Sequence, residues 1–166
     1  WNHTAVSTPD AVVDVLHTSD PHTTTSAALS PDGNDWYFHL RTCDFAGNCT
    51  ATVHAGPFWI DTTAPAVPAG VISSSHATGV PSETDTIDVS WTAPVDGGSG
   101  IDGFSWAFTA SPAWSCETTK DGEEGTAGAS SGQLAAGTWY FHVCAVDNAG
   151  NWGAVASAGP FQITTT

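Results

Sequence analysis

Basic residues are almost absent from this chain. Arg41 and Lys120 are the only arginine and lysine among 166 residues, against 17 aspartates and glutamates, and the formal net charge is −15. Nucleic acids and anionic membrane surfaces are bound through clusters of lysine and arginine that neutralise phosphates. The composition therefore argues against both kinds of partner and predicts a solvated acidic surface that favours solubility.

Methionine and long hydrophobic runs are missing as well. No apolar stretch approaches the roughly 20 residues that a membrane-spanning helix needs, so we expect no insertion into a membrane. No segment keeps apolar residues at helical spacing between capping residues, which argues against helices. Because the chain starts at Trp1 without a signal peptide, we expect a processed or excised segment.

The four cysteines predict disulfides in an oxidising compartment, and we expect an extracellular protein. Cys43 and Cys49 flank a turn and could bridge the base of a hairpin. Cys116 and Cys144 remain, and a bridge between them would tie an exposed stretch of chain to a strand. Zinc is a weaker interpretation, because the sequence contains no Cys-x-x-Cys pair.

The main feature that the sequence does contain is a repeat. Three strings return at a constant offset and without a gap: residues 36–39, 44–48 and 55–60 match residues 139–142, 147–151 and 158–163. Self-similarity of this kind marks tandem structural modules that present a surface or span a distance. We therefore expect function to reside in the array of modules.

Hydrophobic and polar residues alternate over short stretches between turn-forming residues, which predicts an all-β fold. The predicted strands include residues 71–72, 87–91, 104–108, 139–146 and 161–163. In the fourth of these, Trp139, Phe141, Val143 and Ala145 share one face, which is expected to face the core. Several strands separated by turns are typical of two packed antiparallel sheets.

Residues 61–68 are the predicted linker between modules, because they hold two prolines that stiffen the chain. The boundary is placed near residue 65. The sequence is thus predicted to contain a first module over residues 1–64 and a second over residues 65–166.

Three strings of the second module, residues 87–94, 96–104 and 138–151, resemble strands B, C and F of a fibronectin type III-like module. They are similar in particular to the bacterial Ig-like repeats of large secreted and cell-surface proteins. The resemblance implies a complete Ig-like β-sandwich. The chain departs from the family at Trp139, where such modules have a tyrosine whose hydroxyl bonds to the backbone. Tyr140 could supply that bond.

The first module matches this pattern only from strand C onward, since Trp1 aligns with Phe104. The resemblance then implies that strands A and B are missing and that Trp36, Phe38 and Leu40 are exposed, together with an unpaired sheet edge. Soluble proteins avoid such surfaces. Either preceding chain covers this face or a neighbouring subunit donates strands to it. The second arrangement, strand complementation, can connect subunits head to tail into a filament.

Two pairs of oxygen-bearing residues lie around the repeated Ala-Gly turn. Asp44 with Asn48, and Asp147 with Asn151, could contribute to a Ca²⁺ site. The simpler interpretation is a hairpin turn, because Asp bonds its own backbone and Gly and Asn tolerate positive φ. Apart from this Ca²⁺ hypothesis, no cofactor is expected.

The seven histidines show no catalytic or metal-binding pattern. His39 and His142 occur once per module on the outward face of a strand, and their recurrence predicts a surface role. The other five are His3, His17, His22, His54 and His76. Residues 98–103 fit the dinucleotide-binding letters, but an alternating strand follows them where that motif needs a helix. With no nucleophile turn and no phosphate loop, we expect no enzyme.

Three tryptophans, Trp59, Trp114 and Trp152, lie outside the strongest core periodicity. They could form platforms for sugar rings or protein partners, or they could cover the outer face of a sheet or the joint between modules. We favour the covering role.

The leading hypothesis is a non-enzymatic extracellular structural repeat protein, part of a filament, stalk or surface layer, that associates with itself or with neighbouring repeats. One alternative is an adhesin or carbohydrate-binding module that recognises a glycan or a surface protein. Another is a set of spacer domains in a larger secreted hydrolase.

Overall fold

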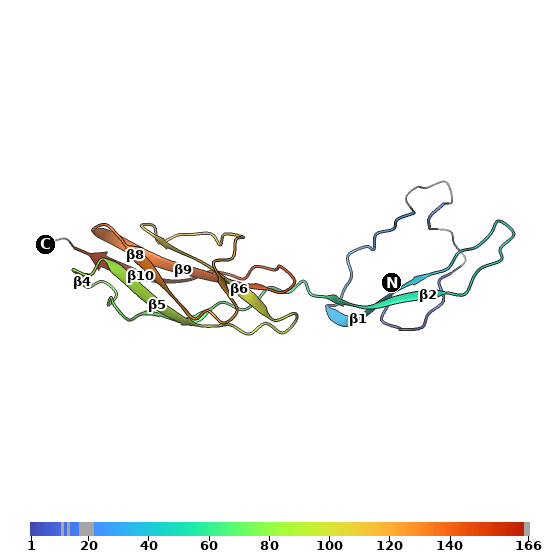
Figure 1. Cartoon of the computed structure of the whole chain (residues 1–166), viewed down its shortest axis with the longest axis horizontal. Coiled ribbons are helices and arrows are strands. Elements are labelled where there is room, and N and C mark those ends of the chain that lie inside the picture. The colour runs from blue at the N-terminus through green and yellow to red at the C-terminus, as the bar shows by residue number, and fades with distance from the viewer. Residues whose placement is uncertain (11, 13, 17–21, 165–166) are drawn as a thin grey trace. The chain divides into compact units, whose positions relative to one another are not determined.

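The protein is all-β (Figure 1). The computed structural model describes residues 1–10, 12, 14–16 and 22–164. It divides into two units, Trp1–Asp61 (unit 1) and Thr62–Thr166 (unit 2), and the division falls at the start of the predicted linker. Within the described residues no helix is present that could cross a membrane.

Unit 2 contains a five-stranded sheet with the order β4-β10-β9-β6-β7. Its central strands are β10 (Ala156–Ile163), β9 (Gly137–Asp147) and β6 (Ile101–Thr109), and its edges are β4 (Pro81–Ser82) and β7 (Gly122–Glu123). All neighbours are antiparallel except β4 and β10, which pair in parallel. The expectation of purely antiparallel sheets is therefore wrong at this edge, where a two-residue strand is too short to produce a periodic pattern.

A second, antiparallel sheet of unit 2 has the order β3-β5-β8. It consists of β3 (Ala69–Ser73), β5 (Thr86–Thr92) and β8 (Gly128–Gln133). Every second residue of β5 is buried from Ile87 to Trp91, as the alternation predicted. The buried residues that both sheets contribute to one core are Ile87, Val89, Trp91, Phe104, Phe141, Val143, Ala145, Phe161 and Ile163. Unit 2 is therefore a β-sandwich.

Strand β9 is buried on both faces. Phe141, Val143 and Ala145 face the core, as predicted, but His142 and Cys144 on the opposite face are also fully buried. A segment that follows β6, residues 110–116, lies against this outer face. Its Ser111 carbonyl bonds to His142, and its Cys116 is joined to Cys144.

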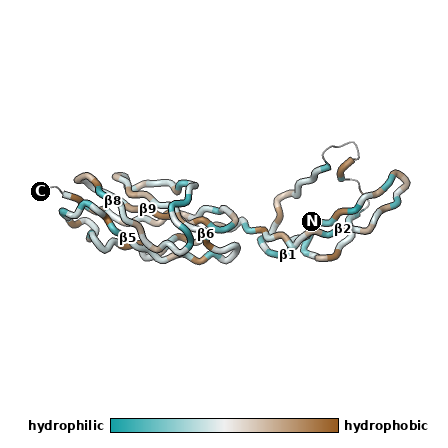
Figure 2. The backbone as a smooth tube through the Cα atoms, in the orientation of Figure 1, coloured by the Kyte–Doolittle hydropathy of each residue, from teal (hydrophilic) through white to brown (hydrophobic). Residues whose placement is uncertain are grey.

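Unit 1 contains a two-stranded antiparallel sheet of β1 (Gly33–Leu40) and β2 (Val53–Ile60). Near its start, Asn2 forms an isolated bridge with Tyr37. In the part of unit 1 that the structure describes, no other strand of two or more residues occurs. Figure 2 shows hydrophobic and hydrophilic positions interspersed along this hairpin. An isolated pair of strands has no core of its own in which its hydrophobic side chains could be buried.

The tryptophans at the start of the repeated strands hold the backbone that precedes them. Trp139 Nε1–H donates to the Ala135 carbonyl at 3.0 Å, and Trp36 Nε1–H donates to the Pro31 carbonyl at 3.1 Å. An indole N–H thus makes the side-chain-to-backbone bond that the resemblance assigns to a tyrosine hydroxyl. Both units therefore contain an indole-to-carbonyl hydrogen bond at this place.

Gly159 in β10 has a backbone conformation that only glycine adopts readily. Its φ is 131°, and an added Cβ would lie 2.9 Å from the Tyr140 ring and 3.0 Å from the Trp139 carbonyl. Gly56 repeats this arrangement against Trp36 and Tyr37, with a φ of 133°.

Gly159→Ala should therefore destabilise unit 2. Backbone strain alone predicts a loss of about 1–3 kcal/mol, to which the close contacts add. Urea unfolding measures the change. Gly125→Ala is the matched control, because a Cβ at Gly125 meets nothing within 4 Å. Equal stability of the two variants would contradict this account.

Candidate functional site

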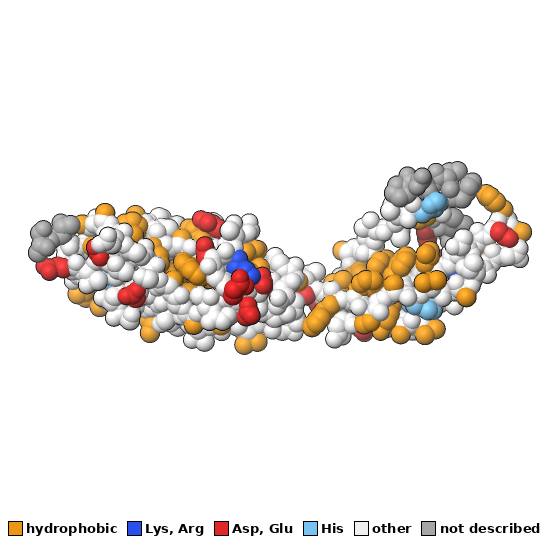
Figure 3. Space-filling view, viewed as in Figure 1, with side chains coloured by type: hydrophobic (Ala, Val, Ile, Leu, Met, Phe, Trp, Pro, Cys, Tyr) orange, Lys and Arg blue, Asp and Glu red, His pale blue; other side chains and the backbone are white. Residues whose placement is uncertain are grey.

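The unit 1 sheet has one apolar face, and part of it is exposed. We define the β1–β2 apolar face as Trp36, Phe38, Leu40, Val53 and Phe58, which the register places opposite one another or in alternation on one side of the hairpin. Figure 3 shows hydrophobic side chains, in orange, gathered over these strands. Monomeric proteins rarely leave such a patch open.

The repeat allows the exposure of this face to be compared with that of the matching core positions in unit 2. Leu40 is 51% exposed, whereas Val143 at the matching position of unit 2 is 0% exposed. Phe58 is 40% exposed, whereas its match Phe161 is 1% exposed. At these two positions the repeated strings are buried in unit 2 and exposed in unit 1.

Two N-terminal side chains cover part of this face. The Trp1 ring lies 4.9 Å from the Phe38 ring and 5.4 Å from the Phe58 ring, and the His3 ring lies 3.9 Å from the Trp36 ring. Trp36 is consequently buried, at 7% exposure. The expectation that Trp36 would be exposed is wrong for this reason, and Phe38 is half-buried.

The three tryptophans singled out from the sequence have different surroundings. Trp114 stacks on His142, with ring centroids 5.8 Å apart and an interplanar angle of 20°. Trp152 is half-buried and forms an isolated bridge with Val146. Trp114 thus helps to cover the outer face of the unit 2 sheet. Trp59 is 63% exposed and is the one of the three that remains open as a binding platform.

His142 does not have the surface role that its recurrence predicted. It is completely buried, and its ring is bonded on both sides. Nε2–H donates to the Ser111 carbonyl at 3.1 Å and lies 3.0 Å from Thr109 Oγ1, while Nδ1 lies 2.7 Å from Ser157 Oγ. The sequence missed this burial because the covering segment is remote in the chain. The pairing of Cys116 with Cys144 was the signal that could have revealed it.

The Ser157–His142 contact has the distance expected of a nucleophile and its base. His142 is nevertheless enclosed beneath Trp114, so a substrate cannot reach the imidazole to exchange protons with it. We interpret the contact as a structural hydrogen bond between β9 and β10.

His39, the match of His142 in unit 1, is half-buried and lies beside a second histidine. Its Nδ1 is 2.7 Å from Nδ1 of His54, and its Nε2 is 3.0 Å from Asn2 Oδ1. Partial burial and, after it, the neighbouring His54 lower the pKa of His39.

The remaining histidines have separate surroundings. His3 contacts Asp35 at 2.7 Å, and the buried His76 bonds to the Thr84 carbonyl at 3.0 Å. His22 is exposed, and His17 lies outside the described residues.

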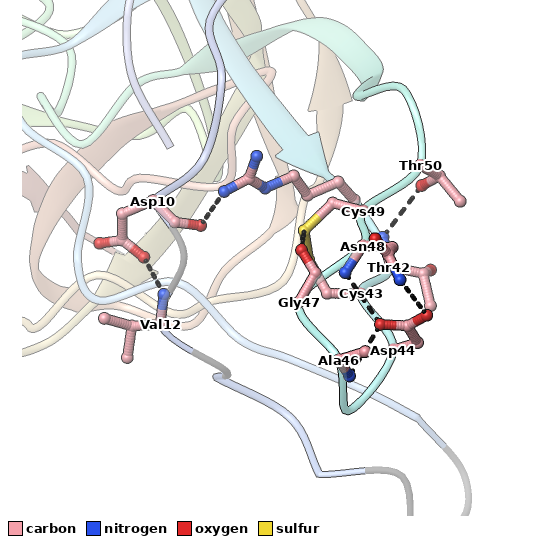
Figure 4. Close-up of a disulfide and its surroundings, with 11 residues drawn as sticks. Asp10, Val12, Thr42, Cys43, Asp44, Ala46, Gly47, Asn48, Cys49 and Thr50 are labelled. Atoms are coloured by element: carbon pink, nitrogen blue, oxygen red, sulfur yellow. Dashed lines mark hydrogen bonds between the residues drawn. A yellow bond between two sulfur atoms is a disulfide. The ribbon is translucent and has the colours of Figure 1, made fainter.

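The repeated Asp-to-Asn turns have nearly identical hydrogen bonds. In unit 1, Asp44 Oδ1 accepts from the backbone N–H groups of Ala46 at 2.9 Å and Asn48 at 2.8 Å, and Oδ2 accepts from Asn48 Nδ2 at 2.8 Å (Figure 4). Asp147 makes the equivalent three bonds to Ala149 and Asn151. These contacts fit the hairpin-turn interpretation. Ca²⁺ binding by the four residues stays an untested prediction.

Both predicted cysteine pairs are bonded. Cys43–Cys49 closes the base of the Asp44 turn, with its Cα atoms 4.0 Å apart (Figure 4). Cys116–Cys144 joins residues 28 apart in sequence and fastens the segment before Cys116 to β9. Two disulfides are typical of a protein from an oxidising environment.

No protein-family model and no curated protein matches the sequence.

Hydrogen bonds in the first turn lower the pKa of Asp44, the largest contribution coming from the Asn48 side chain. A carboxyl with a depressed folded-state pKa stabilises the fold at neutral pH, and this contribution is lost as pH falls through the folded pKa. Asn48→Ala should therefore raise the pKa of Asp44, measured by NMR titration of its carboxyl carbon. Asn34→Ala, elsewhere in unit 1, should leave it unchanged. An unaltered Asp44 titration in Asn48→Ala would contradict the assigned bonds.

Removal of the second disulfide should uncover His142. The double variant Cys116→Ser with Cys144→Ser is expected to cost about 2–5 kcal/mol and to loosen the segment that holds Trp114 in place. Exchange of the histidine C2 proton, read by mass spectrometry, should accelerate at His142. The variant Cys43→Ser with Cys49→Ser serves as the control. Continued protection of His142 in the first variant would count against the covering role.

Proposed function

We propose that this chain is a segment of a non-enzymatic extracellular structural protein built from tandem fibronectin type III-like sandwiches, and that it forms part of a filament, stalk or surface layer. The observation that carries the proposal is the β1–β2 apolar face. It has the sequence of a buried sheet face and, in Leu40 and Phe58, the exposure of a surface.

Unit 2 indicates what would complete unit 1. There, the matching sheet face packs against Ile87, Val89 and Trp91 of β5. Strand β8 bonds only to β5 within its sheet. By the offset of the repeat, the match of β8 is residues 25–30, which lie in irregular structure. The match of β5 would precede Trp1. Among the described residues, no strand corresponding to β5 lies beside residues 25–30.

We infer that the missing cover is an apolar, alternating strand resembling β5, which the described residues of unit 1 do not supply. Preceding chain of the same protein would make unit 1 an ordinary sandwich in a longer stalk. A strand from a neighbouring subunit would connect subunits head to tail, and a heterologous contact that does not close generates a filament. In both cases the modules transmit mechanical load through strand ladders and packed cores.

Other features support a structural role outside the cell. Two disulfides brace the units, and the net charge of −15 keeps neighbouring arrays from clumping. His142, whose Nδ1 lies 2.7 Å from Ser157 Oγ, is enclosed by Trp114. These observations favour a structural role over catalysis.

Trp59 supports a second candidate, an adhesin or carbohydrate-binding module. Its indole is 63% exposed on β2 and could stack on a sugar ring. Glycan-array binding that is lost in Trp59→Ala and retained in Trp114→Ala would favour this function. Array binding that is indifferent to Trp59 would remove its support.

Leu40→Asp tests the leading proposal in the whole parent protein. Leu40 is half-exposed here, so the charge should do little damage until another strand covers the face. If a neighbouring subunit supplies the strand, the variant should fail to polymerise in analytical ultracentrifugation. If preceding chain supplies it, the variant should lose at least about 2 kcal/mol of stability, the lower end for disruption of a buried leucine.

Val95→Asp is the control for this experiment, because Val95 is 82% exposed in unit 2 and should tolerate the charge in either arrangement. The proposal fails if Leu40→Asp alters neither assembly nor stability relative to Val95→Asp.

A further inference from the structure

We propose that His39 and His54 form a binding site for a divalent transition-metal ion of the zinc class, with their two Nδ1 atoms as ligands. This site would be a feature of unit 1 and does not depend on the structural function proposed above. Its parts are two imidazoles from neighbouring strands and an asparagine that fixes the orientation of one of them.

The hairpin register brings the two rings together. His39 on β1 lies directly opposite His54 on β2, so both side chains point to the same side of the sheet. Their Nδ1 atoms are 2.7 Å apart. A zinc ion at about 2.0–2.1 Å from each nitrogen in tetrahedral geometry needs a separation of about 3.3 Å. The rings would have to part by about half an ångström, which the exposed His54 can accommodate.

The surroundings of Asn2 determine which nitrogen of His39 is free to bind a metal. Asn2 Oδ1 accepts from the Thr4 backbone N–H at 2.9 Å, and Asn2 Nδ2 donates to Ser7 Oγ at 3.0 Å, so the amide orientation is fixed. The oxygen that faces His39 Nε2 at 3.0 Å can only accept. His39 therefore carries its proton on Nε2 and directs the lone pair of Nδ1 toward His54.

This is the arrangement that metal-binding histidines have in proteins, where the nitrogen that does not bind the metal donates to an outer acceptor. The proton that His54 Nδ1 now donates to His39 would move through solvent to His54 Nε2, so that both imidazoles stay neutral as the metal binds the two Nδ1 atoms. Because His54 is exposed, water can fill the remaining positions of the ion. The strongly acidic chain also raises the local concentration of cations.

Unit 2 provides a natural comparison. At the positions of His39 and His54 it has His142 and Ser157, joined by the same Nδ1 contact at 2.7 Å but with only one imidazole. His54→Ser therefore gives unit 1 a pair that unit 2 already accommodates in a folded hairpin. The variant removes one ligand and keeps a hydrogen-bond partner for His39.

Zinc chloride titrated into the whole chain, followed by calorimetry, tests the site. Zinc is the probe because neutral imidazole nitrogens are common ligands of this ion. We expect one zinc per chain, at least a tenfold loss of affinity in His54→Ser and no change in His22→Ala, which deletes an exposed histidine elsewhere. Asn2→Ala should weaken binding by about 10–100-fold.

NMR of the imidazole nitrogens gives a second readout that needs no variant. Zinc should shift the Nδ1 resonances of His39 and His54 together and leave those of His142 unchanged. The proposal is overturned if the wild-type chain binds no zinc at millimolar concentration, if His54→Ser and His22→Ala bind it equally, or if the two Nδ1 resonances do not move.

Discussion

A sheet that is apolar on one face must be covered on that face, and this requirement governs both units. In unit 2, both faces of β9 are covered. The β3-β5-β8 sheet covers the inner face of β9, and residues 110–116 cover the outer one through Trp114 and the Cys116–Cys144 bond. In unit 1 the matching face is covered in part, by ring contacts of Trp1 and His3. The difference in burial between the units follows from what lies across the sheet, since the strands themselves are nearly the same.

Local interactions persist where the core is incomplete. The indole bond of Trp36 to Pro31 and the carboxylate bonds of Asp44 have close counterparts in unit 2. Each joins residues no more than five apart, so neither needs an opposing sheet. Such contacts explain how β1 and β2 keep a hairpin without a full sandwich. They do not bury Leu40 or Phe58, which stay 51% and 40% exposed.

The sequence predicted what depends on short-range pattern. The alternation over Ile87, Val89 and Trp91 identified β5 and its buried face, and both disulfides were identified by their positions. It missed β4 and β7, each two residues long, because no periodicity can be read from so few residues. It also missed β8, whose glycines and serines show no alternation of large apolar and polar residues. It also placed His142 on the surface, since burial there is imposed by a separate segment.

The pairing of His39 with His54 was not predicted from the sequence either. The two residues are 15 apart and meet only through the register of the hairpin. The repeat held a signal for it, because the matching residues His142 and Ser157 are also opposite one another. Recognising it required knowing that β9 and β10 pair, which residue spacing alone does not determine.

Electron microscopy of the native assembly, at a resolution that resolves strands, tests the central claim most directly. The account predicts density for at least one additional strand packed across Leu40 and Phe58, continuous either with chain that leads into Trp1 or with a neighbouring subunit. An assembled protein in which that face meets only solvent would contradict it.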